Sequence, residues 1–190
     1  MMQIPHAKFF MGPLQNLNAT GCELPYHGGV MSMIILLPQE WLGLEVVEEK
    51  LLQFDLGEEW KAANLQPQTI SLEVPRFRVE SAIDLEQVLA KIGMTDMFDP
   101  SAANLFKLTS PIEGNAEESL YVSVAIQKAF IDVNEAGSEA AAATLVVVGR
   151  GRRQQLIPRN FICNQPFLYF IRHNPSGLVL FSGKVGNPAA

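Results

Sequence analysis

Short β-prone runs separated by turn residues constrain the fold of this chain more than any other feature of its sequence. From Lys8 to Pro38 the apolar runs are interrupted at Gly12-Pro13, at Asn16 to Gly21 and at His27 to Gly29, which is typical of a three-stranded meander. We expect the run from Val30 to Leu37 to be its most buried strand. Twelve prolines and fourteen glycines without a fixed period also favour a turn-rich sheet protein.

The middle of the chain contains helical patterns and one further extended run. The spacing of apolar residues predicts two short amphipathic helices around Gly57, which should cap a sheet. The run from Thr69 to Val79 is predicted to be extended, and Pro75 inside it indicates an edge or a bend between two sheets. Asp84 is the predicted N-cap of a third helix that ends at Gly93.

Three strands are expected in the last third of the chain. Leu120 to Val133 predicts a long strand that is rich in β-branched and aromatic residues. Phe167 to Arg172 and Leu178 to Val185 predict two more, joined by a turn at Asn174 to Gly177. Together these elements predict an α+β protein dominated by β-sheet, with a few short helices. The length of 190 residues is compatible with one domain.

Charge and hydropathy exclude several classes of function. The net charge of −6, from 20 acidic and 14 basic residues, provides no basic field for phosphate backbones, so we expect no nucleic-acid partner. Met31 to Pro38 is far shorter than the roughly 20 apolar residues that a membrane helix needs, so we expect no membrane partner. Met1 to Pro5 shows no signal-peptide pattern.

The residues that most often perform chemistry show no catalytic or metal-binding arrangement. Cys22 and Cys163 could pair in an oxidising compartment, but two free buried thiols are the favoured interpretation. His6, His27 and His173 are scattered without ligand spacing, and no residue lies in a recognisable nucleophile motif. We therefore expect no metal, no cofactor and no enzymatic activity.

One stretch does not resemble part of an ordinary domain. Asn134 to Thr144 is small and weakly hydrophobic, Leu145 to Val148 is strongly β-prone, and Gly149 to Gln155 is basic and flexible. One interpretation is an alanine helix followed by a solvated turn. In the other, small side chains slide between two existing strands and gain a ladder of backbone hydrogen bonds. Arginines at an exposed tip would meanwhile offer a trypsin-like protease its preferred side chain.

This stretch closely resembles the hinge of the serpins, a family of serine protease inhibitors. Asn134 to Thr144 is similar to the hinge, and Asn164 to Arg172 is similar to the C-terminal signature of the family. Weaker similarity includes Ala129 to Val133 and Gly183 to Pro188, and extends back to Met1. The resemblance implies that residues 1–190 form the C-terminal part of a single serpin domain. Its reactive loop would span about 135–157, and the N-terminal half of the domain would be absent.

The resemblance also implies a mechanism. A protease cleaves the serpin loop and forms an acyl-enzyme, and the loop then inserts as a new strand into sheet A and distorts the protease before deacylation. Inhibition succeeds only if insertion is faster than hydrolysis of the ester. We therefore expect a serine protease inhibitor that acts as a suicide substrate. A non-inhibitory binding or carrier protein, and a fragment that is only a protease substrate, are the alternatives.

Individual residues match the hinge. Gly137 matches the hinge glycine, whose freedom at positive φ lets the chain swing, and Ser138 matches the small first residue to insert. Glu135 and Arg76 resemble an ion pair between the inserting strand and its neighbour, whereas Gln127 departs from the histidine that many members have there. The hinge positions implied by the resemblance are Glu135, Gly137, Ser138, Ala140, Ala141, Ala142, Ala143 and Thr144.

The scissile bond is expected near the arginines that follow the hinge. The family's usual count from Glu135 reaches Gly151, which is a poor specificity residue. Arg152 is ranked first, because it leaves a more usual length to the C-terminal signature, and Arg150 second. Both predict a trypsin-like target. Arg150 to Arg153 also matches the pattern cut by furin-like convertases, which would place the bond after Arg153.

The expected compartment is extracellular. Asn18-Ala19-Thr20 is an N-glycosylation sequon and would suit a secreted glycoprotein. Since serpins also occur inside cells, an intracellular location stays open.

Overall fold

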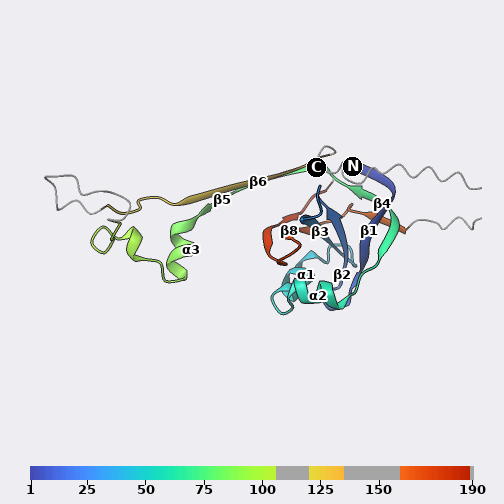
Figure 1. The fold of residues 1–190 in the computed structure, drawn as a ribbon, viewed down its shortest axis with the longest axis horizontal. Coiled ribbons are helices and arrows are strands. Elements are labelled where there is room, and N and C mark those ends of the chain that lie inside the picture. The colour runs from blue at the N-terminus through green and yellow to red at the C-terminus, as the bar shows by residue number, and fades with distance from the viewer. Residues whose placement is uncertain (106–119, 135–158, 189–190) are drawn as a thin grey trace, which may run out of the picture. The chain divides into compact units, whose positions relative to one another are not determined.

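The computed structural model describes residues 1–105, 120–134 and 159–188 (Figure 1). The chain divides into two compact units. The first comprises Met1–Phe77 and Asp132–Ala190, and the second comprises Arg78–Ile131. Each unit is described by itself below.

The first unit is built on one seven-stranded sheet with the strand order β7-β4-β1-β2-β3-β8-β9. Neighbouring strands are antiparallel except β4 and β7, which run parallel. The predicted meander is confirmed as β1, β2 and β3, although the first strand begins before Lys8 and continues through Gly12-Pro13, which was expected to interrupt it, and the second strand already begins at Ala19. The strands are β1 (Met2–Leu14), β2 (Ala19–Pro25), β3 (Met31–Pro38), β4 (Pro67–Val74), β7 (Arg159–Ile162), β8 (Phe167–His173) and β9 (Val179–Val185).

Strand β3 lies in the interior of this sheet, between β2 and β8, and is buried along most of its length. Its residues from Ser32 to Leu36 are all buried, which confirms the prediction of a buried strand. Val30 had been included in the prediction, but it precedes β3 and is exposed. Because successive strand residues point to opposite faces, unbroken burial means that both faces of the sheet are covered at β3.

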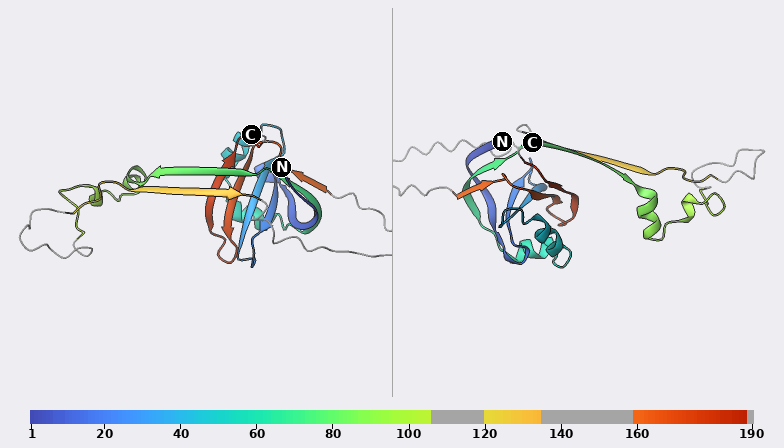
Figure 2. Two further views of the ribbon diagram at one scale, coloured as in Figure 1. Left: turned by 90° about the horizontal axis from the view of Figure 1, so that it is seen from above. Right: turned by 180° about the vertical axis from the view of Figure 1, so that it is seen from behind.

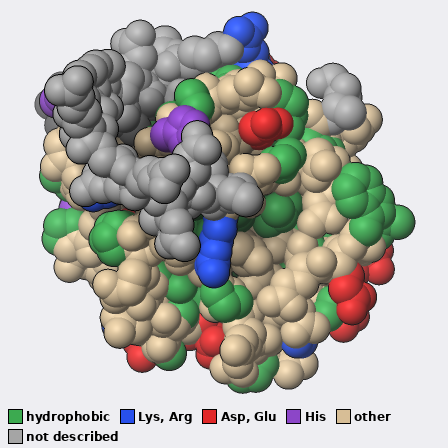
Figure 3. All heavy atoms as spheres, turned by 90° about the vertical axis from the view of Figure 1, so that its right-hand side faces the viewer, with side chains coloured by type: hydrophobic (Ala, Val, Ile, Leu, Met, Phe, Trp, Pro, Cys, Tyr) green, Lys and Arg blue, Asp and Glu red, His purple; other side chains and the backbone are tan. Residues whose placement is uncertain are grey.

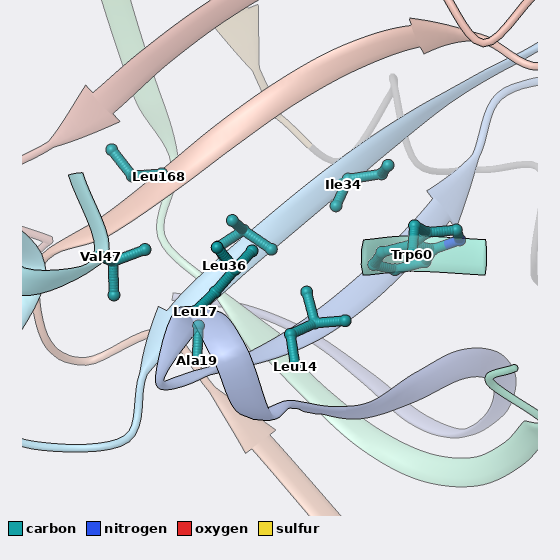
Figure 4. Packing of buried hydrophobic residues seen from close by; sticks show 8 residues of the cluster. All are labelled: Leu14, Leu17, Ala19, Ile34, Leu36, Val47, Trp60 and Leu168. Carbon is teal, nitrogen blue, oxygen red and sulfur yellow. The ribbon is translucent and has the colours of Figure 1, made fainter. Parts of the chain in front are cut away.

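Two short helices cover one face of the sheet. They are α1 (Leu44–Leu51) and α2 (Leu56–Ala62), and the 3₁₀ helix η1 (Gln15–Leu17) lies close to α1 in the fold. Figure 4 shows Val47 of α1 and Trp60 of α2 facing residues of β1, β2, β3 and β8. This cluster consists of Leu14, Leu17, Ala19, Ile34, Leu36, Val47, Trp60 and Leu168. The two predicted capping helices are thus present.

The boundary between the two helices differs from the prediction. Gly57 was expected to separate them, but it lies inside the first turn of α2. The helix begins earlier because Asp55 is its N-cap, and the Asp55 Oδ1 accepts a hydrogen bond of 2.9 Å from the backbone N–H of Glu58.

The cysteines lie in the first unit as free, buried thiols, as the favoured interpretation predicted. Burial raises the pKa of both Cys22 and Cys163, so each thiol stays neutral at physiological pH. Their surroundings therefore give them the character of small apolar core residues.

The second unit contains a two-stranded sheet of β5 (Phe77–Asp84) and β6 (Ile126–Val133), whose arrows run in opposite directions in Figure 2. The chain leaves β4 at Val74 and enters β5 at Phe77, so the predicted bend at Pro75 between two sheets is confirmed. β5 leads into α3 (Leu85–Lys91) and the 3₁₀ helix η2 (Asp96–Phe98).

Both ends of α3 follow the prediction, whereas the start of β6 does not. Asp84 is the N-cap, with its Oδ1 accepting a 3.0 Å hydrogen bond from the backbone N–H of Glu86, and Gly93 follows the helix at φ +89°. The strand expected from Leu120 begins only at Ile126. The preceding backbone is bonded elsewhere: Val122 N–H donates to the Met97 carbonyl, and the carbonyl of Ala125 accepts from Leu85 N–H.

Candidate functional site

The predicted reactive loop lies outside the described residues. The hinge from Glu135 to Thr144 and the four bond candidates, Arg150, Gly151, Arg152 and Arg153, all fall in the range 135–158. These assignments therefore stay predictions. Arg76 is exposed at the bend between β4 and β5, but its expected partner Glu135 falls in the same range, so their ion pair is a prediction as well.

Strand β6 leads directly toward the predicted hinge. It ends at Val133, and Asn134 follows with its Nδ2 donating a 3.1 Å hydrogen bond to Oδ1 of Asp132. Within the part of the chain that the structure describes, β6 pairs only with β5. One long edge of β6 consequently presents backbone groups that a further strand could pair with.

The two-stranded sheet of β5 and β6, which leads to the predicted hinge, has a cationic and an aromatic side chain on its surface. The guanidinium carbon of Arg78 lies 5.6 Å from the ring centroid of Phe130, which is itself 68% exposed. Arg78 also forms an exposed ion pair with Glu80. Gln127 is exposed on the same sheet. These contacts are solvent-exposed and contribute little stability by themselves.

The chain returns to the first unit through β7, which is firmly attached. β7 pairs in parallel with β4, from Ile70 opposite Arg159 to Glu73 opposite Ile162. Phe161 is buried at 2% exposure, and Cys163 N–H donates a 2.9 Å hydrogen bond to the Glu73 carbonyl. The segment 135–158 therefore joins strands of two different sheets, with β7 as a well-packed attachment on the C-terminal side.

The C-terminal signature forms part of the core. Gln165 is buried, and its Nε2 donates a 2.7 Å hydrogen bond to the carbonyl of Pro38. The ring of Phe77 packs against Phe167 and Tyr169, with centroids 5.9 Å and 5.3 Å apart. Burial raises the pKa of Tyr169. The signature thus has a packing role: it holds β8 against Phe77 at the bend into β5 and bonds to the end of β3.

Sequence reasoning missed a polar network around Arg172 at the end of the signature. Its Nη2 lies 3.2 Å from Oε1 of Glu23, and both side chains are nearly buried, with 16% and 13% exposure. Its guanidinium carbon lies 5.7 Å from the ring centroid of Trp60. Asn174 Oδ1 accepts from Arg172 Nε and from Ser32 Oγ. No local signal could reveal this network, because its members come from three strands, helix α2 and a turn.

The remaining sequence predictions concern glycosylation, metal binding and membrane crossing. Asn18 is exposed in the connection between β1 and β2, where it adopts a left-handed conformation at φ +51°. Among the described residues, no three His, Cys, Asp or Glu side chains gather closely enough to hold a metal ion. None of the helices in the described part of the chain has both the length and the apolar character for crossing a bilayer.

Comparison with known proteins identifies the family. A family model described as Serpin (serine protease inhibitor) matches residues 1–188. Leukocyte elastase inhibitor A of Rattus norvegicus is 38% identical over 192 residues, covering 98% of this chain and 48% of the relative. Plasminogen activator inhibitor 1 of Bos taurus is 40% identical over 166 residues, covering 87% of this chain and 39% of the relative. The chain belongs to the serpin family, and it spans about half the length of the curated relatives it matches.

Solved serpin structures show the same fold. Serpin48 of the insect Tenebrio molitor matches with a TM-score of 0.65 and 30% identity, covering 97% of this chain and 44% of that one. Uncleaved ovalbumin matches with a TM-score of 0.69 and 26% identity, covering 97% and 46%. The α+β prediction is therefore confirmed as a serpin fold, with this chain corresponding to less than half of each solved structure.

Proposed function

We propose that this chain supplies the protease-baiting part of a serpin that inhibits serine proteases as a suicide substrate. The single observation that supports this most is the hinge sequence from Glu135 to Thr144 in a confirmed serpin. A charged residue at position 138 would be buried on insertion, and bulky residues in the alanine run would clash with the neighbouring strands. Ser138 is small and uncharged, and positions 140–143 are all alanine. The inhibitory activity belongs to the protein that also contains the remaining strands and helices of the domain.

The flanking strands support an insertion mechanism. β6 ends at Val133, two residues before Glu135, and among the described residues it has strand pairing on one edge only. A loop that folds back beside this edge would gain a new ladder of backbone hydrogen bonds. On the C-terminal side of the loop, β7 pairs with β4. Cleavage of the loop between β6 and β7 would therefore leave the C-terminal piece attached to the first unit through this pairing.

The arginines after the hinge support a trypsin-like target. We place the reactive bond after Arg152, with Arg150 as the second choice. Cleavage after Arg153 by a furin-like convertase is the alternative that the basic pattern favours. The relatives named leukocyte elastase inhibitor make an elastase the necessary comparison enzyme, because elastase pockets accept small apolar side chains and reject arginine.

The direct test uses a chimera that restores the full length. The N-terminal part of the porcine leukocyte elastase inhibitor, up to the position aligned with Met1, is fused to this chain and incubated with trypsin. We expect a covalent complex that survives boiling in detergent, and a released peptide whose mass places the bond after Arg152. The same incubation with leukocyte elastase and with furin ranks the target classes. Cleavage outside Val148 to Gln154 would contradict the assigned loop.

Matched variants separate cleavage of the loop from covalent trapping of the protease. Arg152→Ala should remove the trypsin adduct while leaving the hinge unchanged. Ser138→Glu should leave cleavage intact but abolish the adduct, because inserting the first hinge residue would bury a charge. If Ser138→Glu still forms the adduct at the original rate, hinge insertion is not the trapping step.

A second candidate function concerns the 190-residue chain by itself. Since β6 has no second neighbouring strand among the described residues, this part of the chain contains no pair of strands on either side of a gap for the loop to enter. We propose that alone it acts as a protease substrate that is cleaved without trapping. Trypsin should then cut it cleanly near Arg152, with no boiling-resistant adduct.

Two further assignments rest on the sequence and on exposure. Arg76 and Glu135 are proposed to form an ion pair that holds the strand in register, and exchanging both charges should restore adduct formation lost by either single reversal. Asn18 is proposed as an N-glycosylation site of a secreted form, because its side chain is exposed. Expression in a secreting host should give a glycosidase-sensitive mass increase that Asn18→Gln removes.

A further inference from the structure

The side chain of Gln68 joins the two strands that lie on either side of β4. In the strand order of the first unit, β4 lies between β7 and β1. The Gln68 Nε2 donates a 2.7 Å hydrogen bond to the backbone carbonyl of Met11 on β1. Its Oε1 accepts a 3.2 Å hydrogen bond from Nη1 of Arg159, the first residue of β7. We call these three residues the Gln68 clamp. All three belong to this chain, so the clamp does not depend on the part of the domain that lies outside it.

The two partners of Gln68 require an amide at this position. A backbone carbonyl only accepts hydrogen bonds and a guanidinium only donates them, so the two ends of one amide satisfy both. The amide donor reaches β1 just beyond Phe10, whose partner on β4 is Pro67, a residue with no N–H to donate. A glutamate would keep an acceptor for Arg159 but lose the donor to Met11, and a methionine would provide neither.

The two ends of β7 are held differently. At the C-terminal end, Phe161 is buried and the Cys163 N–H donates to a backbone carbonyl of β4. At the N-terminal end, the pairing begins with Arg159 opposite Ile70, directly after the range that contains the predicted reactive loop. The end of a short strand opens easily, because few bonds hold it. The bond from Gln68 to Arg159 therefore acts at the end of β7 that would open first.

The charge around the clamp favours this bond. A guanidinium donor makes the hydrogen bond charge-assisted, and such bonds are stronger than those between neutral groups. Figure 3 looks onto the side of the first unit where β1 and β4 lie in Figure 1, and the Lys and Arg side chains visible there lie apart from one another. No basic cluster visible on this face would repel a guanidinium that is held at Gln68.

We propose that the Gln68 clamp fixes which arginine of the reactive loop is presented to a protease. The inference rests on the proposed function, and in it Gln68 is a positioning residue that acts through Arg159. Arg152 precedes Arg159 by seven positions, which is at most about 25 Å of extended chain, and each further residue adds only about 3.5 Å. A protease pocket accepts one arginine at a time. Loosening the anchored end by one residue is therefore enough to present a different arginine.

The experiment follows trypsin cleavage of the complete 190-residue chain at low conversion, with the masses of the paired fragments identifying each cut bond. Because efficient attack needs the bond held in place, wild type should be cut at least about tenfold more often after one of the three candidates than after the others. Gln68→Met should reduce this preference about fivefold, the effect of one lost hydrogen bond. It should also make the bond after Arg159 cleavable. The candidates are Arg150, Arg152 and Arg153.

A conservative variant separates positioning from stability. Gln68→Glu and Gln68→Met both lose the donor to Met11, so both should lower the melting temperature measured by circular dichroism. Only Gln68→Glu keeps an acceptor for Arg159, and it should retain most of the wild-type preference. Arg159→Met should reduce the preference as Gln68→Met does, and combining the two changes should reduce it no further. These variants decide the question even if Gln68→Met fails to fold.

Gln66→Met is the matched control, because the Gln66 side chain bonds only locally among the described residues, to the carbonyl and the side chain of Asn64. It should leave the preference unchanged. Equal cutting at all three arginines in wild type would overturn the clamp. An unchanged preference in both Gln68→Met and Arg159→Met would overturn it too, as would an equal fall in Gln66→Met. Any of these results leaves the proposed function standing, whereas absence of cutting at all three arginines in wild type would contradict the proposed function itself.

Discussion

Helices α2 and α3 have the same length of seven residues and begin with the same kind of aspartate cap, yet they differ in what they bury. α2 places Trp60 against the sheet of the first unit, at 8% exposure. In the described structure α3 has no buried side chain, and Ile92 just after it is 69% exposed. An amphipathic pattern therefore identifies the side of a helix that would pack, but it does not supply the surface to pack against.

Trp60→Ala is the change with the largest expected effect on this comparison. Removing the indole leaves a cavity above Gly21 and deprives Arg172 of its aromatic neighbour, so we expect a loss of about 3–5 kcal/mol in the free energy of unfolding. Urea unfolding followed by circular dichroism measures this loss. A loss below about 1 kcal/mol would contradict the packing described for α2.

Gly183→Ala should have the next largest effect. A Cβ at this position of β9 would overlap the side chain of Tyr169 on the neighbouring strand, and its displacement should cost about 1–3 kcal/mol. Gly186→Ala is the matched control, since a Cβ there would meet nothing within 4 Å. The difference between the two unfolding midpoints tests how tightly the β8–β9 pair is packed.

Removing the aspartate cap of each helix tests the same contrast between α2 and α3, with a smaller expected effect on stability. Asp55→Ala should destabilise the first unit by about 1 kcal/mol, because the N–H of Glu58 loses its acceptor. Asp84→Ala removes the equivalent acceptor from α3, where little tertiary structure depends on the helix. Hydrogen exchange should therefore show local loss of protection in α3 alone for Asp84→Ala, and a shift across the first unit for Asp55→Ala.

The smallest effect is expected for Ile92→Ala, with a change within about 0.5 kcal/mol. The side chain is largely solvent-exposed, so its truncation leaves almost no cavity. A substantially larger destabilisation of the 190-residue chain would show that α3 does pack against a partner surface, and would break the contrast with α2.

Much of the first unit was predictable because its signals are local. The connections at residues 15–18 and 26–30, which separate β1, β2 and β3, contain asparagine and glycine, and Pro75 marks the bend between sheets. The predicted starts of α2 and β6 were wrong because hydrogen bonds to the local backbone competed with the pattern of residue types. Asp55 started α2 before Gly57, and pairing of the Leu120 to Ala125 backbone with α3 and η2 delayed β6 until Ile126.

In the candidate site, too, features with a local sequence signal were predictable and features without one were not. Family membership could be predicted from the hinge and from the C-terminal signature, because both are contiguous motifs. The Arg172–Glu23 pair could not be predicted, since 149 residues separate its two partners in the sequence. Likewise, nothing in the sequence shows that Gln68 bonds to both Met11 and Arg159, which lie on different strands.

The sequence by itself determined the short strands, the helix caps, the serpin family and the basic residues of the proposed bait, because turn chemistry, capping and contiguous motifs act over a few residues. Tertiary structure decided which amphipathic faces are buried, which charges meet, and which edge of β6 has no pairing strand among the described residues. These outcomes depend on contacts between residues that the fold brings together from distant parts of the chain, and such contacts leave no local pattern to predict them.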